Sequence, residues 1–157
     1  MELIKEKPRY DTWFVFTVME EIGCYGASAA ANAVKPSVAI VVETTTAADF
    51  AGRDDGKCAC ILGKGAVVPV MDRSTIADRA LHAKVTALAN DKNIAWQPKT
   101  MIAGGTDASQ IQRSLDGVRV VTVSAPCRNI HSPSCVLKLS DIQAQYELVA
   151  EASKMDF

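Results

Sequence analysis

The sequence predicts an α/β fold in which a mixed, mostly parallel sheet is flanked by helices. Short runs of β-branched residues alternate with longer amphipathic stretches, as they do in a sheet covered by helices. The runs are nearly all apolar, which is typical of strands buried on both faces. The length of 157 residues and the hydrophobic fraction of 48% suit one domain with a single core.

Three apolar runs are predicted as the main strands, at residues 12–19 (TWFVFTVM), 38–43 (VAIVVE) and 118–123 (VRVVTV). The first is expected to be a central strand that is buried on both faces. Residues 27–34, between the first two strands, are rich in alanine and favour a helix, which Lys35 and Pro36 end. These segments form one strand, helix, strand unit.

Further helices and shorter strands follow in the second half of the chain. Residues 78–90 place Leu81, Val85 and Leu88 on one helical stripe, with Asp78 near the helix start. The other predicted elements are an irregular connection at 44–65, strands at 67–70 and 95–101, and helices at 107–115 and 140–153, the last with Ser140 as its N-cap. Residues 1–7 resemble the last turns of a helix without a start, so the fold is expected to be incomplete at its N-terminus.

Composition argues against several classes of function. The formal net charge is -1, so there is no basic surface for nucleic acid or for an anionic membrane. The sequence has no apolar run of about 18 residues and no signal-peptide core, which favours a cytoplasmic protein. Its five cysteines are an odd number and are expected to be reduced, with Cys58 and Cys60 as two ordinary thiols.

Charged residues follow the ends of the three main predicted strands. Glu20 and Glu21 end the first, Glu43 ends the second, and His131 comes shortly after the third. Each has an ordinary alternative, such as a solvated turn for the glutamate pair or a capping role for the histidine. The carboxyl ends of neighbouring strands, however, meet at one crevice in an open α/β sheet. Carboxylates and an imidazole together suit zinc, cobalt or manganese.

Neighbouring residues on a strand face opposite ways, so Glu20 and Glu21 are expected to have different roles. One can bind metal while the other faces substrate as a general base. A glycine-rich turn at Gly104 and Gly105 precedes the predicted helix at 107–115. That helix start can receive an anion or a substrate carbonyl, or it is simply capped by Thr106 or Asp107.

Four motifs, in their order and spacing, strongly resemble the family of glutamyl aminopeptidases and tetrahedral aminopeptidases, some of whose members were named cellulases or endoglucanases. The motifs are EEIG with a following GA (20–27), VMDRS (70–74), GGTDA (104–108) and RNIHSP (128–133). The resemblance implies a three-layer α/β/α fold like that of zinc exopeptidases, two divalent metal ions, zinc or cobalt, and hydrolysis of N-terminal residues from peptides. It covers essentially the whole chain.

The resemblance also implies a role for each matching residue. Glu20 is similar to the general base, and Glu21 and His131 are similar to ligands of one metal ion. Glu43 stands where the family usually has an aspartate that binds the other ion. The implied substrate side comprises Gly104, Gly105, Thr106, Asp107 and Arg128.

This sequence departs from the family pattern in that several family residues are expected to be absent from it. In the family, a histidine, an aspartate that bridges the two metals and a dimerisation insert precede the EE motif, and here they would lie before Met1. His82 lies in a predicted helix and is not a replacement. We therefore expect a carboxy-terminal part of the catalytic domain that binds one metal ion or none, has little activity alone and self-associates.

Two other functions remain open at this point. A glycoside hydrolase would also use two carboxylates, but such enzymes line their clefts with aromatic residues, and only 6% of this chain is aromatic. The third hypothesis is a non-catalytic assembly module that keeps the remains of a metal site.

Overall fold

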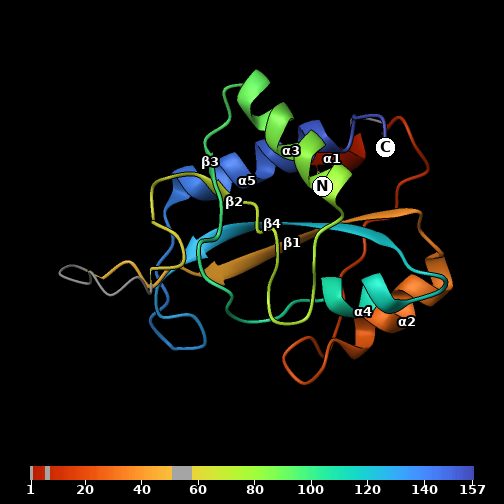
Figure 1. Cartoon of the computed structure of the whole chain (residues 1–157), viewed down its shortest axis with the longest axis horizontal. Coiled ribbons are helices and arrows are strands. Elements are labelled where there is room, and N and C mark those ends of the chain that lie inside the picture. The colour runs from red at the N-terminus through yellow and green to blue at the C-terminus, as the bar shows by residue number, and fades with distance from the viewer. Residues whose placement is uncertain (1, 6–7, 51–57) are drawn as a thin grey trace.

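A four-stranded sheet lies between two layers of helices in the computed structural model, which describes residues 2–5, 8–50 and 58–157 (Figure 1). The strands are β1 (Val38–Thr46), β2 (Ala66–Val67), β3 (Trp96–Gln97) and β4 (Arg119–Cys127), in the order β1-β4-β2-β3. β1 and β4 are parallel, β2 and β3 are parallel, and β2 runs antiparallel to β4. The predicted mixed, mostly parallel sheet flanked by helices is confirmed.

The register of the two long strands positions the candidate site. Val38 pairs with Arg119 at one end, and Thr46 pairs with Cys127 at the other, so β1 and β4 end at the same edge of the sheet. β4 is the central strand and is buried over nearly its whole length, whereas β1 is an outer strand whose Val42 is 56% exposed.

The helices α3 (Arg79–Asp91) and α5 (Leu139–Ala152) cover one face of the sheet (Figure 1). Their apolar sides meet strand residues in the main core, where Leu81, Val85 and Leu148 are fully buried. Asp78 caps α3 as predicted, because its Oδ1 accepts a hydrogen bond of 2.8 Å from the Leu81 N–H.

The helices α2 (Tyr25–Val34) and α4 (Ala108–Arg113) lie on the opposite face, where they pack against each other (Figure 1). A smaller core joins α4 to the sheet through Ala108, Val41 and Val120. The short helix α1 (Glu2–Lys5) is followed by a segment that returns to the C-terminus, where the Tyr10 hydroxyl donates to Asp156 and its ring lies 5.7 Å from that of Phe157.

The prediction of a buried strand at 12–19 is wrong. This segment has no regular secondary structure, and its apolar side chains are largely exposed: Phe16 is 93% exposed and Trp13 is 65% exposed. A strand exists only when a neighbouring strand satisfies its backbone groups, and in the described residues this segment has no such neighbour.

The other differences from the predictions concern element ends. β2 and β3 have two residues each instead of the longer runs predicted at 67–70 and 95–101. Ser140 lies within the first turn of α5 and is not its N-cap, because the helix begins at Leu139 after Lys138. β1 continues to Thr46, which shortens the predicted irregular connection; residues 51–57 of that connection lie outside the described residues.

All five cysteines are free thiols. In the described part of the chain, no helix is both long enough and apolar enough to cross a bilayer.

Candidate metal centre

A hollow of about 370 Å³ lies where β1 and β4 end. It brings together Glu20, Glu21, Glu43 and His131, the four residues that sequence analysis assigned to the base and the metal ligands. The predicted glycine-rich turn forms part of its wall. The remaining lining residues are Cys24, Thr44, Thr45, Thr46, Pro69, Asp72, Ser74, Lys99, Ala103, Gly104, Gly105, Thr106, Thr122, Ser124 and Ile130.

Glu20 and Glu21 lie in a turn at 20–23 and not at a strand end. The Gly23 and Cys24 N–H groups donate to the Glu20 carbonyl oxygen at 3.1 and 3.0 Å, which closes the turn immediately before α2. Glu20 is partly buried and Glu21 is exposed. The prediction that a strand ends at Glu20 and Glu21 is therefore wrong, and the turn, not the alternation of a strand, gives the two carboxylates different exposure.

His131 lies next to Glu21. Its Nε2 is 3.1 Å from Glu21 Oε1, and both side chains are mostly exposed to solvent. The backbone of His131 has φ 62°, a left-handed conformation within the loop that follows β4. Two ligands of one tetrahedral zinc ion lie about 3.3 Å apart, since each is about 2.0 Å from the metal. The spacing of this pair therefore fits two ligands of a shared ion.

Negative charge accumulates at Glu43. Burial, together with the carboxylates of Glu20 and Asp107, raises the pKa of Glu43 to about 7. Burial also raises the pKa of Glu20, with the charges of Glu21 and Asp107 adding to it. Carboxylates that raise one another's pKa in this way are stabilised by a cation between them, so the donor set of the hollow fits a divalent metal.

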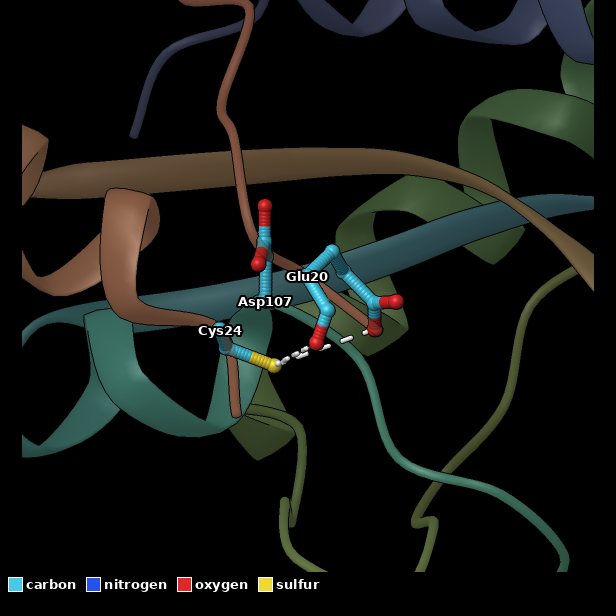
Figure 2. A group of neighbouring side chains, drawn as sticks. All are labelled: Glu20, Cys24 and Asp107. Carbon is cyan, nitrogen blue, oxygen red and sulfur yellow. Dashed lines mark hydrogen bonds between the residues drawn. The ribbon is translucent and has the colours of Figure 1, made fainter. Parts of the chain in front are cut away.

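Asp107 is only 6% exposed and precedes α4. Its Oδ2 accepts a hydrogen bond of 2.5 Å from the Thr17 hydroxyl, while its buried Oδ1 has no partner. Thr106, and not Asp107, caps the helix start, because its hydroxyl oxygen accepts from the Ala108 N–H at 3.3 Å. An oxygen of the Asp107 carboxylate lies within 4.8 Å of ligand atoms of Glu20 and Cys24 (Figure 2).

Arg128 and His82 lie outside the lining of the hollow. The Arg128 guanidinium makes a bidentate pair with Asp49, at 2.7 Å from Nε and 2.9 Å from an Nη to the two carboxylate oxygens. This pair holds the pKa of Asp49 below its usual value. His82 Nε2 is 3.3 Å from the Val68 carbonyl oxygen, so His82 has a structural partner within the fold.

Sequence analysis missed two groups of the hollow. Cys24 is buried beside Glu20, and the Lys99 ammonium is partly buried and donates to the Ala103 carbonyl oxygen at 2.5 Å. Burial lowers the pKa of Lys99. The position of Cys24 four residues after Glu20, at the start of a helix, was the signal that could have identified the cysteine.

Comparison with known proteins shows the family and the fold of this chain. The sequence pattern described as M42 glutamyl aminopeptidase matches residues 1–148. The lysyl aminopeptidase of Pyrococcus furiosus is 32% identical over 152 residues, which are 94% of this chain and 42% of that protein. The fold matches aminopeptidase APDkam598 from Desulfurococcus kamchatkensis with a TM-score of 0.86 and 31% identity, over 89% of this chain and 40% of that one.

A second similar structure is the TET1 peptidase of Pyrococcus horikoshii, which can assemble into a tetrahedron or a large octahedral shell. It has a TM-score of 0.75 and 30% identity, over 90% of this chain and 40% of that chain. The chain thus spans less than half the length of the relatives it matches. Because the family pattern covers most of its residues, the chain belongs to the M42 glutamyl aminopeptidase family.

Proposed function

We propose that this chain supplies the carboxy-terminal part of the active site of a metal-dependent aminopeptidase, which removes N-terminal residues from peptides. The observation that carries the proposal is the gathering of Glu20, Glu21, Glu43 and His131 in one hollow at the ends of β1 and β4. The aminopeptidase names of the relatives and the family membership support the same reaction class.

Glu21 and His131 would hold one divalent ion, zinc or cobalt, and Glu43 would hold a second. A pair of such ions lowers the pKa of a shared water and polarises the scissile carbonyl. Glu43 is one methylene longer than the aspartate usual at this position, and its carboxylate starts from the middle of the register, opposite Ser124, and not from the end of β1. The carboxylate of Glu43 therefore has a greater distance to span than the carboxylate of a residue at the strand end, and the extra methylene covers part of that distance.

Glu20 is the proposed general base. Its partial burial raises its pKa toward neutrality, which suits a group that accepts a proton from water and returns it to the departing amine. Glu20 is partly buried, whereas Glu21 and His131 pair with each other in an exposed position. Gly104, Gly105 and Thr106 line the same hollow, and we place the substrate backbone along them, with Asp107 next in the chain.

Arg128 supports the site from outside. Its pairing with Asp49 ties the loop after β4 to the segment after β1, and both segments lead into the hollow. We propose that it shapes the substrate side in this indirect way.

Three metal ligands are fewer than two four-coordinate ions need. We therefore propose that the isolated chain binds metal weakly and has little activity until further ligands are added by the rest of an M42 domain. Self-association into a homo-oligomer is part of the proposal, since a related peptidase assembles into shells. The free cysteines are consistent with the proposed location in the cytoplasm.

Cobalt titration of the dialysed chain by calorimetry tests the ligand assignments. We expect weak binding that Glu21→Gln and His131→Asn each reduce at least tenfold, whereas Glu20→Gln leaves it nearly unchanged. Glu147→Gln, an exposed glutamate on α5, is the matched control. Wild-type affinity in both ligand variants would contradict the assignment, and a stoichiometry near two tight ions per chain would contradict the proposed shortage of ligands.

Activity assays separate the three function classes. Aminoacyl-nitroanilides and cellulose are offered to the chain with added cobalt. Nitroanilide turnover that Glu20→Gln abolishes supports the aminopeptidase, and release of sugar from cellulose would support a glycoside hydrolase. Silence with both substrates, combined with undiminished assembly, would favour the non-catalytic module.

A further inference from the structure

We propose that Glu20, Cys24 and Asp107 form a separate cation site, which takes a thiophilic divalent ion such as zinc or cadmium. When it is filled, Glu20 is held by the ion and is no longer available as a base. The inhibitory consequence rests on the proposed function, whereas the binding site does not.

The geometry of the three side chains is close to that of a metal site. One ligand atom from each of them lies within 4.8 Å of the others, and Figure 2 shows the Cys24 sulfur directed at Glu20 with Asp107 beside them. Cys24 Sγ is 3.7 Å from Glu20 Oε1. In tetrahedral zinc sites the sulfur and oxygen ligands lie about 3.5 Å apart, given bonds of about 2.3 and 2.0 Å. Ligand atoms that start further apart than this, at up to 4.8 Å, move inward when the ion binds.

Asp107 provides independent evidence for a ligand. It is 6% exposed, and its Oδ1 is completely buried without any hydrogen-bond partner. The Thr17 hydroxyl satisfies only Oδ2. A buried carboxylate oxygen without a hydrogen-bond partner is costly and rare. A cation can bind this oxygen without breaking any hydrogen bond to it. A metal ion beside Asp107 would satisfy this oxygen.

The three ligands come from different elements that the fold holds together. Glu20 lies in the turn before α2, Cys24 directly precedes α2, and Asp107 directly precedes α4, which packs against α2. The site is therefore anchored by helix packing and does not depend on the exposed loop of His131. Glu21 and His131 are not members of this cluster.

The donor set selects the class of metal. A thiolate with two carboxylates favours zinc and cadmium, whereas magnesium and calcium prefer oxygen ligands only. In the metal-free protein, the Cys24 thiol interacts with the carbonyl and carboxylate oxygens of Glu20, at 3.6 and 3.7 Å. Metal binding replaces these contacts: a sulfur–metal bond forms, and the thiol proton leaves to the solvent.

Cadmium titration of the whole chain tests the site, because a cadmium–thiolate bond gives an ultraviolet charge-transfer band. We expect the band in the wild type and its loss in Cys24→Ser. Asp107→Asn should weaken cadmium binding at least tenfold. The exposed thiol in Cys135→Ser and the half-buried one in Cys58→Ser are the matched controls, and both variants should keep the band.

Persistence of the full band in Cys24→Ser, or its loss in Cys135→Ser or Cys58→Ser, would overturn the proposal. Circular dichroism checks that the serine variant is folded; if it is not, the affinity of Asp107→Asn decides, and wild-type affinity there would also overturn it. His131→Asn should keep the cadmium band while it weakens cobalt binding. Failure of the cation site is thereby distinguished from failure of the proposed peptidase site.

Discussion

Replacing Glu43 by glutamine should stabilise the metal-free protein above neutral pH. Burial raises the pKa of Glu43 from 4.5 to about 7, with Glu20 and Asp107 adding to the shift. In the unfolded chain the carboxyl group ionises near 4.5. Between these two values the folded state binds more protons than the unfolded state, so the free energy of unfolding falls as pH rises. The ionised carboxylate thus destabilises the fold fully at pH 8 and little at pH 4.

The size of the effect follows from the shift. A change of about 2.5 in pKa corresponds to about 3 kcal/mol at the upper limit. Glu43 is only partly buried, so solvent screening reduces the value to about 1–2 kcal/mol. Glutamine has nearly the same shape and no charge. The variant should therefore gain about 1–2 kcal/mol relative to the wild type at pH 8, and almost nothing at pH 4.

Urea denaturation with a chelator at pH 4, 6 and 8 measures this difference. The matched control is Glu147→Gln, whose exposed side chain accepts a hydrogen bond from Gln143 on the same helix. The control should show no comparable change with pH. An equal or lower free energy of unfolding for Glu43→Gln at pH 8 would refute the argument that charge at this position opposes folding in the absence of metal.

Three further predictions concern the fold. Leu81→Ala removes a fully buried core side chain and should lower the free energy of unfolding by about 2–5 kcal/mol in urea; a loss under about 1 kcal/mol would contradict the core assignment. Asp141→Ala removes the carboxylate that accepts from the Gly63 and Gly65 N–H groups at 2.7 and 2.9 Å. Hydrogen exchange of these two amides should accelerate, and the free energy of unfolding should fall by about 2 kcal/mol. Unchanged exchange would contradict this role of Asp141. Phe16→Ser changes a side chain that is 93% exposed and should alter stability by no more than about 0.5 kcal/mol, whereas a larger loss would indicate that residues 12–19 are buried.

Periodicity and capping predicted the elements whose stability is decided locally. The stripe of Leu81 and Val85 with the Asp78 cap located α3 to within one residue at each end. The apolar runs located the starts of β1 and β4 equally well. Residues 12–19 have the same composition, but composition cannot say whether a neighbouring strand is present to pair with them. The two-residue strands β2 and β3 likewise depend on partners that are distant in sequence.

Part of the site could be predicted from the rule that neighbouring parallel strands end at the same edge of a sheet. The parallel strands β1 and β4 end at one edge, and Glu43 and His131 line the hollow there, although Glu43 lies three residues before the end of β1 and not at the predicted strand end. Cys24 and the unpartnered oxygen of Asp107 were not predictable in this way. They are brought together by the packing of α2 on α4, and only the three-dimensional structure shows that an oxygen lacks a donor.

Several carboxylates elsewhere in the chain are paired with positively charged side chains, and this supports a cation at the hollow. Asp49 and Asp78 each have an arginine partner, and hydrogen bonds from these arginines lower their pKa values. In the described residues, Glu43 and Asp107 have no such partner, and Lys99, which lines the same hollow, donates to a backbone carbonyl instead. Arginine therefore neutralises the structural carboxylates of Asp49 and Asp78, whereas the buried Asp141 carboxylate accepts from backbone N–H groups. A metal ion at the hollow would neutralise the charges of Glu43 and Asp107, and this holds for the peptidase site and for the proposed cysteine-containing site alike.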